Sequence, residues 1–170
     1  MKVTFWGVRG SLPTPLSPEK IKAKIDAVVQ RISAADVEDS NSRERFISSL
    51  PPWIYGTVGG NSACVEMRTN DGQTFILDAG SGIRLLGKKL IKEDVKVFHI
   101  FISHFHWDHI QGLPFFDPAY KKDSEIHFYS PSENTKDILF SQMKEPEFPV
   151  TMDAFSKKIT YHYIVPNVPF

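Results

Sequence analysis

The spacing of apolar residues predicts a short strand at the N-terminus and then a helical segment. Val3 and Phe5 alternate with polar residues, which is the period of a half-buried strand. After a loop rich in Gly and Pro, Ser17 can cap a helix whose apolar residues recur at helical spacing up to Ile32. Residues 34–44 are polar and predict a loop.

A second short helix is predicted around Phe46 to Leu50, because Pro51 and Pro52 would end it. We interpret residues 16–54 as a helical insertion packed on the surface of the domain. On this interpretation residues 1–170 form one domain, and the insertion is not a domain of its own.

The rest of the chain contains strands that first follow one another and then alternate with helices. The pattern predicts strands at 63–68, 74–77, 95–103, 126–129 and 159–165, and helices at 83–91 and from about 130 to 143. Asn70-Asp71-Gly72 between the first two strands indicates a hairpin. The run at 95–103 is mostly apolar, which suits a strand covered on both faces. Ser130 and Glu133 form a capping-box pattern. This order favours an α/β or α+β fold with a mixed sheet.

Composition adds few constraints on function. The chain has 20 Lys and Arg residues together and 20 Asp and Glu residues together, so it lacks the basic excess that supports nonspecific nucleic-acid binding. This balance is still compatible with a local basic groove. Cys64 is the single cysteine, which excludes an intrachain disulfide and fits a reducing compartment. Without a signal peptide pattern or an apolar run of membrane-spanning length, we expect a cytoplasmic protein that contacts no membrane.

The strongest chemical signal is a cluster of histidines where the strand at 95–103 ends. His104, His106, Asp108 and His109 lie within six residues. Imidazole nitrogen and carboxylate oxygen are ligands that Zn²⁺ prefers. In an extended segment positions i and i+2 point to the same side, so His104 and His106 could bind one metal together. Four ligand-type residues this close suit two metals roughly 3.5–4 Å apart bridged by a hydroxide.

The same segment matches the H-x-H-x-D-H signature of the metallo-β-lactamase superfamily. Four other segments are similar to this family in the same order: Gly7–Ser11, Gly59–Glu66, Leu77–Gly82 and Ile110–Phe116. The resemblance covers most of the chain outside 16–54. It is nearest to an uncharacterised branch beside ribonuclease Z and phosphodiesterases. It implies a four-layer α-β-β-α sandwich, of which this chain would supply about the first half.

The resemblance also implies roles for individual residues. His104 and His106 would bind a first divalent metal, and Asp108 and His109 a second. Zn²⁺ is favoured, with Mn²⁺ or Fe as alternatives. The implied reaction is hydrolysis of a phosphodiester by a metal-bound hydroxide, with a small-molecule or nucleotide-type substrate. Asp108 would be catalytic as well as a ligand, because it could steer the proton of the attacking water.

The sequence departs from the family after this motif. Family members supply a third histidine, a bridging aspartate and a last histidine, and no such motif follows here. His127 and His162 lie in predicted strands and match no ligand position. Three interpretations stay open: a fragment, a site completed by a second polypeptide (a homo-oligomer or a complementing C-terminal segment), or a truncated or degenerate non-catalytic domain. The end at Pro166–Phe170, soon after a strand, is unlike a domain end. Hydrolysis of an ester, thioester or lactone is a further alternative.

Two other polar residues are candidates for the site. Asp78 precedes a Gly-Ser-Gly turn, and the resemblance favours a role in which its carboxylate accepts a hydrogen bond from a ligand histidine and orients the ring, although a helix-capping role is compatible. Arg9 could bind a substrate phosphate or form a surface ion pair. His99 and Cys64 are expected to pack within their strands, and Ser103 to be a strand-end residue.

Overall fold

The structure is a computed structural model that describes residues 1–165 and 168, so the predicted chain end at Pro166–Phe170 lies largely outside the described residues. The chain divides into two compact units. One comprises Met1–Thr14 together with the chain from Val58 onward, and the other comprises Pro15–Thr57. The second unit corresponds to the predicted insertion at 16–54. That the insertion packs on the surface of a single domain stays a prediction.

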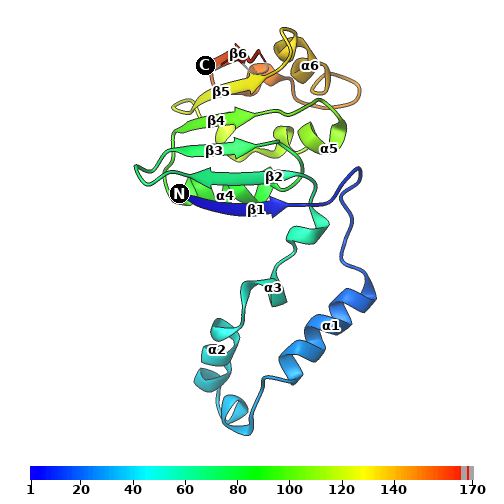
Figure 1. Ribbon diagram of the computed structural model, residues 1–170, viewed down its shortest axis with the longest axis vertical. Coiled ribbons are helices and arrows are strands. Elements are labelled where there is room, and N and C mark those ends of the chain that lie inside the picture. Colours follow the sequence, from blue (N-terminus) through cyan, green and yellow to red (C-terminus); the bar gives the residue numbers. More distant parts are fainter. Residues whose placement is uncertain (166–167, 169–170) are drawn as a thin grey trace. The chain divides into compact units, whose positions relative to one another are not determined.

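The first unit is built on one mixed sheet of six strands, which confirms the predicted mixed α/β class. The strands are β1 (Lys2–Gly7), β2 (Cys64–Arg68), β3 (Thr74–Leu77), β4 (Val97–Phe101), β5 (Glu125–Ser130) and β6 (Lys158–Tyr163). They lie side by side in the order of the sequence (Figure 1). Pairing is antiparallel from β1 to β3 and parallel from β3 to β6. The carboxyl ends of β3, β4 and β5 therefore meet at one edge of the sheet.

The predicted hairpin is confirmed by the antiparallel pairing of β2 and β3, with Val65 opposite Leu77. Gly72 has a φ of 89°, a conformation that glycine adopts at little steric cost. Among its described residues this unit has three α-helices: α4 (Ile83–Lys92), α5 (Trp107–Ile110) and α6 (Thr135–Ser141). None of the helices in the described part of the chain has the length and apolarity that a membrane crossing requires.

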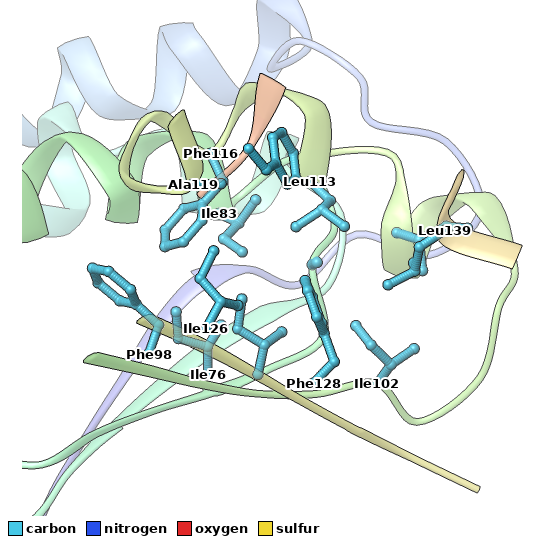
Figure 2. Close-up of a cluster of buried hydrophobic side chains, with 14 of the residues drawn as sticks. Ile76, Ile83, Phe98, Ile102, Leu113, Phe116, Ala119, Ile126, Phe128 and Leu139 are labelled. Carbon is cyan, nitrogen blue, oxygen red and sulfur yellow. The ribbon is translucent and has the colours of Figure 1, made fainter. Parts of the chain in front are cut away.

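The hydrophobic core lies on one face of the sheet (Figure 2). The strands β3, β4 and β5 each contribute a fully buried side chain to this face, namely Ile76, Phe98 and Phe128. They meet α4 and the 3-10 turn at Leu113–Phe115, and the rings of Phe98 and Phe116 pack edge to face at 5.3 Å. Cys64 is buried too, as expected, and burial raises the pKa of its thiol. This core fixes the strands whose ends carry the histidine motif.

The opposite face of the sheet corrects the prediction that the strand at 95–103 is covered on both faces. Phe98 and Ile100 are buried, but Val97 is 42% exposed and His99 and Phe101 are only partly buried. Rings of neighbouring strands stack on one another there, with centroids of Phe101 and Tyr129 4.4 Å apart. The apolar run arose because both strand faces carry aromatic side chains, and in the described residues only one face is packed into the core.

Two predicted boundaries also differ from the structure. Strand β5 continues to Ser130, and α6 begins at Thr135, so Ser130 and Glu133 do not form the predicted capping box. The Ser130 side chain is buried instead and contacts the Thr135 hydroxyl. Ser130 is therefore the last residue of a buried strand, although the local sequence pattern predicted that it would cap a helix.

The second unit contains three helices: α1 (Pro18–Val29), α2 (Ser40–Ser49) and α3 (Pro52–Tyr55). Ser17 caps α1 as predicted, by accepting a hydrogen bond from the Lys20 amide. The predicted loop at 34–44 is wrong, because a 3-10 turn and the first residues of α2 lie within it. Asp39 caps the start of α2, because its carboxylate accepts a hydrogen bond from the Ser42 amide at 2.7 Å. The start of this helix is therefore marked by a capping residue and not by the spacing of apolar residues.

Candidate metal centre

The histidine motif begins just after β4, at the edge where the parallel strands end. Asp78 comes directly after β3, and Ser103 follows β4 by two residues. The Asp78 amide donates to the carbonyl of Phe101 at 2.8 Å, which ties the two strand ends together. Open α/β sheets place ligand sites at such strand ends. The topology thus brings Asp78 to the motif although 25 residues separate it from Ser103.

The side chains of the motif lie close to one another. The ring centroid of His104 lies 4.5 Å from the ring centroid of His106 and 4.0 Å from that of His109. His109 Nε2 and Asp108 Oδ2 are 3.5 Å apart. Two ligand atoms that each lie about 2.1 Å from one ion, at a tetrahedral angle, are separated by about 3.4 Å. Asp108 and His109 are therefore spaced as two ligands of a common metal ion would be.

Asp78 and Ser103 control which ring nitrogens are free. Asp78 Oδ2 lies 2.8 Å from His109 Nδ1, and Ser103 donates to Asp78 from its amide and from its hydroxyl. The single hydroxyl proton of Ser103 goes to the carboxylate, so its oxygen accepts from His104 Nδ1 at 3.0 Å. Both histidines then carry their proton on Nδ1, which leaves Nε2 of each with a lone pair for a metal.

Asp78 adopts the left-handed backbone region, with a φ of 61°. Aspartate tolerates this conformation better than most residues, and such outliers concentrate at functional sites. The unusual backbone places one carboxylate within reach of both Ser103 and His109. The predicted contact of Asp78 with a ligand-type histidine is present, while its effect on metal binding stays a prediction.

Asp108 is held from the first loop of the chain. The Ser11 amide donates to Asp108 Oδ2 at 2.8 Å, and this hydrogen bond lowers the pKa of the Asp108 carboxyl. Ser11 has a φ of 59°, so the loop turns sharply where it meets the carboxylate. The carboxyl group is consequently ionised at neutral pH, the form that binds a metal. Sequence reasoning missed Ser11, because a backbone amide that reaches across 97 residues leaves no mark in side-chain chemistry.

Close backbone contacts hold α5 against the turn after β3. The Ala79 amide donates to the carbonyl of His109 at 2.7 Å, and the Gly112 amide donates to the carbonyl of Ala79 at 2.9 Å. A Cβ at Gly112 would lie 2.0 Å from the Gly80 carbonyl oxygen, and one at Gly80 would lie 2.3 Å from that of Asp108. Glycine is required at both positions, because the two backbones approach more closely than a side chain allows.

The other candidates contact different partners. Arg9 donates from Nε to the Gly59 carbonyl at 3.2 Å, which fixes its position in the first loop. Its predicted contact with a substrate phosphate stays a prediction. His127 lies between His162, at 3.1 Å, and Glu125, at 2.9 Å, on the partly exposed sheet face. Burial and the neighbouring His127 and His162 lower the pKa of His99 on the same face.

The motif fits a metal in its chemistry but only partly in its arrangement. Within residues 1–165 and 168, no group of three or more His, Cys, Asp or Glu side chains converges on one metal position. The His104 ring lies near the rings of both His106 and His109, and His109 lies near Asp108, so the four side chains are neighbours without a common focus. The donor set and the free Nε2 atoms nevertheless suit divalent metals such as Zn²⁺.

Comparison with known proteins agrees with this geometry. The Metallo-beta-lactamase superfamily model matches residues 55–128, which include β2 to β5 up to Phe128 and the whole motif. Ribonuclease Z of Pyrococcus abyssi is 32% identical over 94 residues, which are 52% of this chain and 31% of that protein. Ribonuclease Z of Methanocaldococcus jannaschii is 32% identical over 76 residues, which are 43% and 24% of the two chains.

A third relative, the lactamase-like protein aptB of Emericella nidulans, is 30% identical over 123 residues, which are 61% of this chain and 39% of that protein. The chain therefore spans about a third, or less, of the length of the two ribonuclease Z proteins that it matches. No solved structure matches the chain. The family match across the sheet and the motif, together with these relatives, shows that residues 55–128 are similar to the metallo-beta-lactamase superfamily and that this part of the chain resembles ribonuclease Z.

Proposed function

We propose that this chain carries the metal-binding part of a hydrolase that cleaves phosphodiesters. The observation that carries the proposal is the pairing of Asp108 Oδ2 with His109 Nε2 at 3.5 Å, with Asp78 on the opposite nitrogen of the same ring. A carboxylate that orients a histidine from behind is the usual support of a metal-binding imidazole. Several relatives named ribonuclease Z support a nucleotide-type substrate.

The motif would hold two divalent metal ions, with His104 and His106 on one and Asp108 and His109 on the other. Bound divalent ions lower the pKa of water to about 7 and stabilise the charge that develops on a phosphoryl oxygen. Asp108 is already ionised because the Ser11 amide donates to it, so its carboxylate is available both to hold a metal and to accept a proton from water. Arg9 is a candidate for neutralising a substrate phosphate.

Metal content and turnover of the full chain test this proposal. We expect close to two equivalents of Zn²⁺ per chain after dialysis, and hydrolysis of bis-p-nitrophenyl phosphate that stops when a chelator removes the metal and resumes when Zn²⁺ returns. Mn²⁺ and Fe²⁺ should be compared in the same assay. A chain that binds no metal at micromolar Zn²⁺ and cleaves neither a phosphodiester nor an acyl ester would refute the proposal.

A non-catalytic role is the second candidate, and the lack of three converging ligands among the described residues favours it. The same assay separates the two, because a degenerate domain would bind little metal. Faster turnover of a thioester or lactone than of the phosphodiester would instead assign the site to acyl substrates.

We expect Asp78→Asn to weaken Zn²⁺ binding by about 10–100-fold. The substituted amide can donate to His109 Nδ1, which favours the tautomer whose proton blocks Nε2. Competition with a chromophoric chelator measures the affinity. Asp94→Asn is the matched control, because Asp94 also has a left-handed backbone, with a φ of 55°, but pairs with Lys96 on the surface. Equal affinities of both variants and the unmodified chain would contradict a role for Asp78.

A further inference from the structure

A groove lined by aromatic side chains lies beside the candidate metal centre. It has a volume of about 630 Å³ and runs between α5, the turn at Leu113–Phe115 and the segment from α6 to Phe148. Trp107 lines it and is 81% exposed, and Phe115 is 50% exposed. The rings of Phe115 and Phe148 meet edge to face at 5.8 Å. This volume lies within the range of small-molecule sites, about 300–1,000 Å³.

A polar group on the groove wall has no partner. Gln142 lines the groove, and its Nε2 is buried without a hydrogen bond among the described residues. A buried amide donor without a partner is unfavourable, and native proteins rarely tolerate one unless a ligand or water completes it. The wall therefore combines aromatic surfaces and one unsatisfied amide with four other polar or charged side chains, those of Gln111, Ser141, Lys144 and Glu147.

We propose that this groove binds a nucleobase. A planar heteroaromatic ring can stack on the exposed faces of Trp107 and Phe115, and an acceptor atom on its edge can take the proton of the Gln142 amide. An aliphatic ligand would leave the amide unsatisfied. A phosphate alone could contact Lys144 but would make no use of the aromatic walls.

The position of the groove links it to the candidate chemistry. Helix α5 is a single turn that carries Trp107 on the groove and Asp108 against the Ser11 amide. The inferred role of the groove rests on the proposed function in one respect, since the groove would select the base next to the bond that is cleaved. Binding of the base itself requires no metal, so it can be measured separately.

Binding of AMP to the full chain, measured by ligand-observed NMR in the presence of a chelator, tests the proposal. We expect saturable binding of AMP that is at least about tenfold tighter than that of ribose 5-phosphate, because stacking of the base supplies the difference. Phe115→Ala and Gln142→Leu should each weaken AMP binding about tenfold. Phe5→Ala is the matched control, since Phe5 is 57% exposed on β1 and does not line the groove, and it should leave AMP affinity unchanged.

Several results would overturn the proposal. Equal affinity for AMP and ribose 5-phosphate would assign binding to the phosphate, and toluene binding as tightly as AMP would show a merely apolar groove. If Gln142→Leu raises the unfolding midpoint but leaves AMP affinity unchanged, Gln142 does not recognise the base. A dinucleotide that binds more tightly than AMP would identify a nucleic-acid end as the source of the base, and equal binding would identify a free nucleotide. If the chain binds AMP but takes up no metal, the nucleobase site is supported and the proposed hydrolase is refuted. If the chain takes up metal and hydrolyses the phosphodiester but does not bind AMP, the hydrolase is supported and the nucleobase site is refuted.

Discussion

Replacing His104 and His106 together by alanine is expected to lower the affinity for Zn²⁺ by on the order of ten-thousandfold or more and to abolish phosphodiester hydrolysis. Zinc bound by a full protein site gains about 10–16 kcal/mol, so each of about four ligands contributes about 2.5–4 kcal/mol and two contribute about 5–8 kcal/mol. Removal of two imidazoles should leave water in their place and one metal without protein ligands. Competition with a chelator of known affinity measures the loss, and bis-p-nitrophenyl phosphate reports the activity.

The paired variant His127→Ala with His162→Ala is the control for this prediction. These two rings also lie close together, with 3.1 Å between His127 Nδ1 and His162 Nε2, but they lie on the sheet face, where His127 also contacts Glu125, and they do not belong to the motif. We expect this variant to keep both metal content and turnover. The proposed roles of His104 and His106 fail if the control loses as much metal as the motif variant, or if the motif variant still turns over substrate at the full rate.

Gly112→Ala is expected to destabilise the fold by about 3 kcal/mol, at the upper end of the cost of overpacking. The added methyl group would lie 2.0 Å from the Gly80 carbonyl oxygen. The neighbouring atom is backbone, so no side-chain rotation relieves the clash, and α5 must move away from the turn after β3. The hydrogen bond from Gly112 to Ala79 would be lost with this movement. Urea denaturation followed by circular dichroism measures the change.

Gly10→Ala provides the comparison, because a Cβ at Gly10 meets nothing within 4 Å and no left-handed backbone is involved. We expect its unfolding free energy to lie within about 0.5 kcal/mol of the unmodified chain. A Gly112→Ala chain as stable as Gly10→Ala would show that the close approach of α5 to the Gly80 turn is not present in solution.

The parts of the fold that short-range patterns determine could be predicted from the sequence. The hairpin around Gly72 follows from one turn, and the histidine motif lies at a strand end as its flanking residues indicate. Contacts between distant segments could not be predicted. Ser11 reaches Asp108 through its backbone amide, which any residue except proline possesses, so no residue type marks the contact.

Boundaries set by burial were also beyond local reasoning. Ser130 lies in a sequence that favours a helix cap, yet the strand pairing of β5 with β6 extends to Ser130 and decides its conformation. Similarly, the apolar run at Val97–Phe101 indicates burial but does not say that only Phe98 and Ile100 reach the core. Which face is covered depends on the position of the helices, which the strand sequence does not contain.

The hydrogen bond from the Thr14 amide to the Gly60 carbonyl, 3.0 Å long, has a consequence for how this chain can vary. It joins the two points between which the Pro15–Thr57 unit leaves and re-enters the rest of the chain. Loop-closure entropy grows only slowly with length once the ends of a segment are fixed. Evolution could therefore lengthen, shorten or exchange these helices at little thermodynamic cost to the sheet, and the unit is the natural place for diversification among proteins that share this motif.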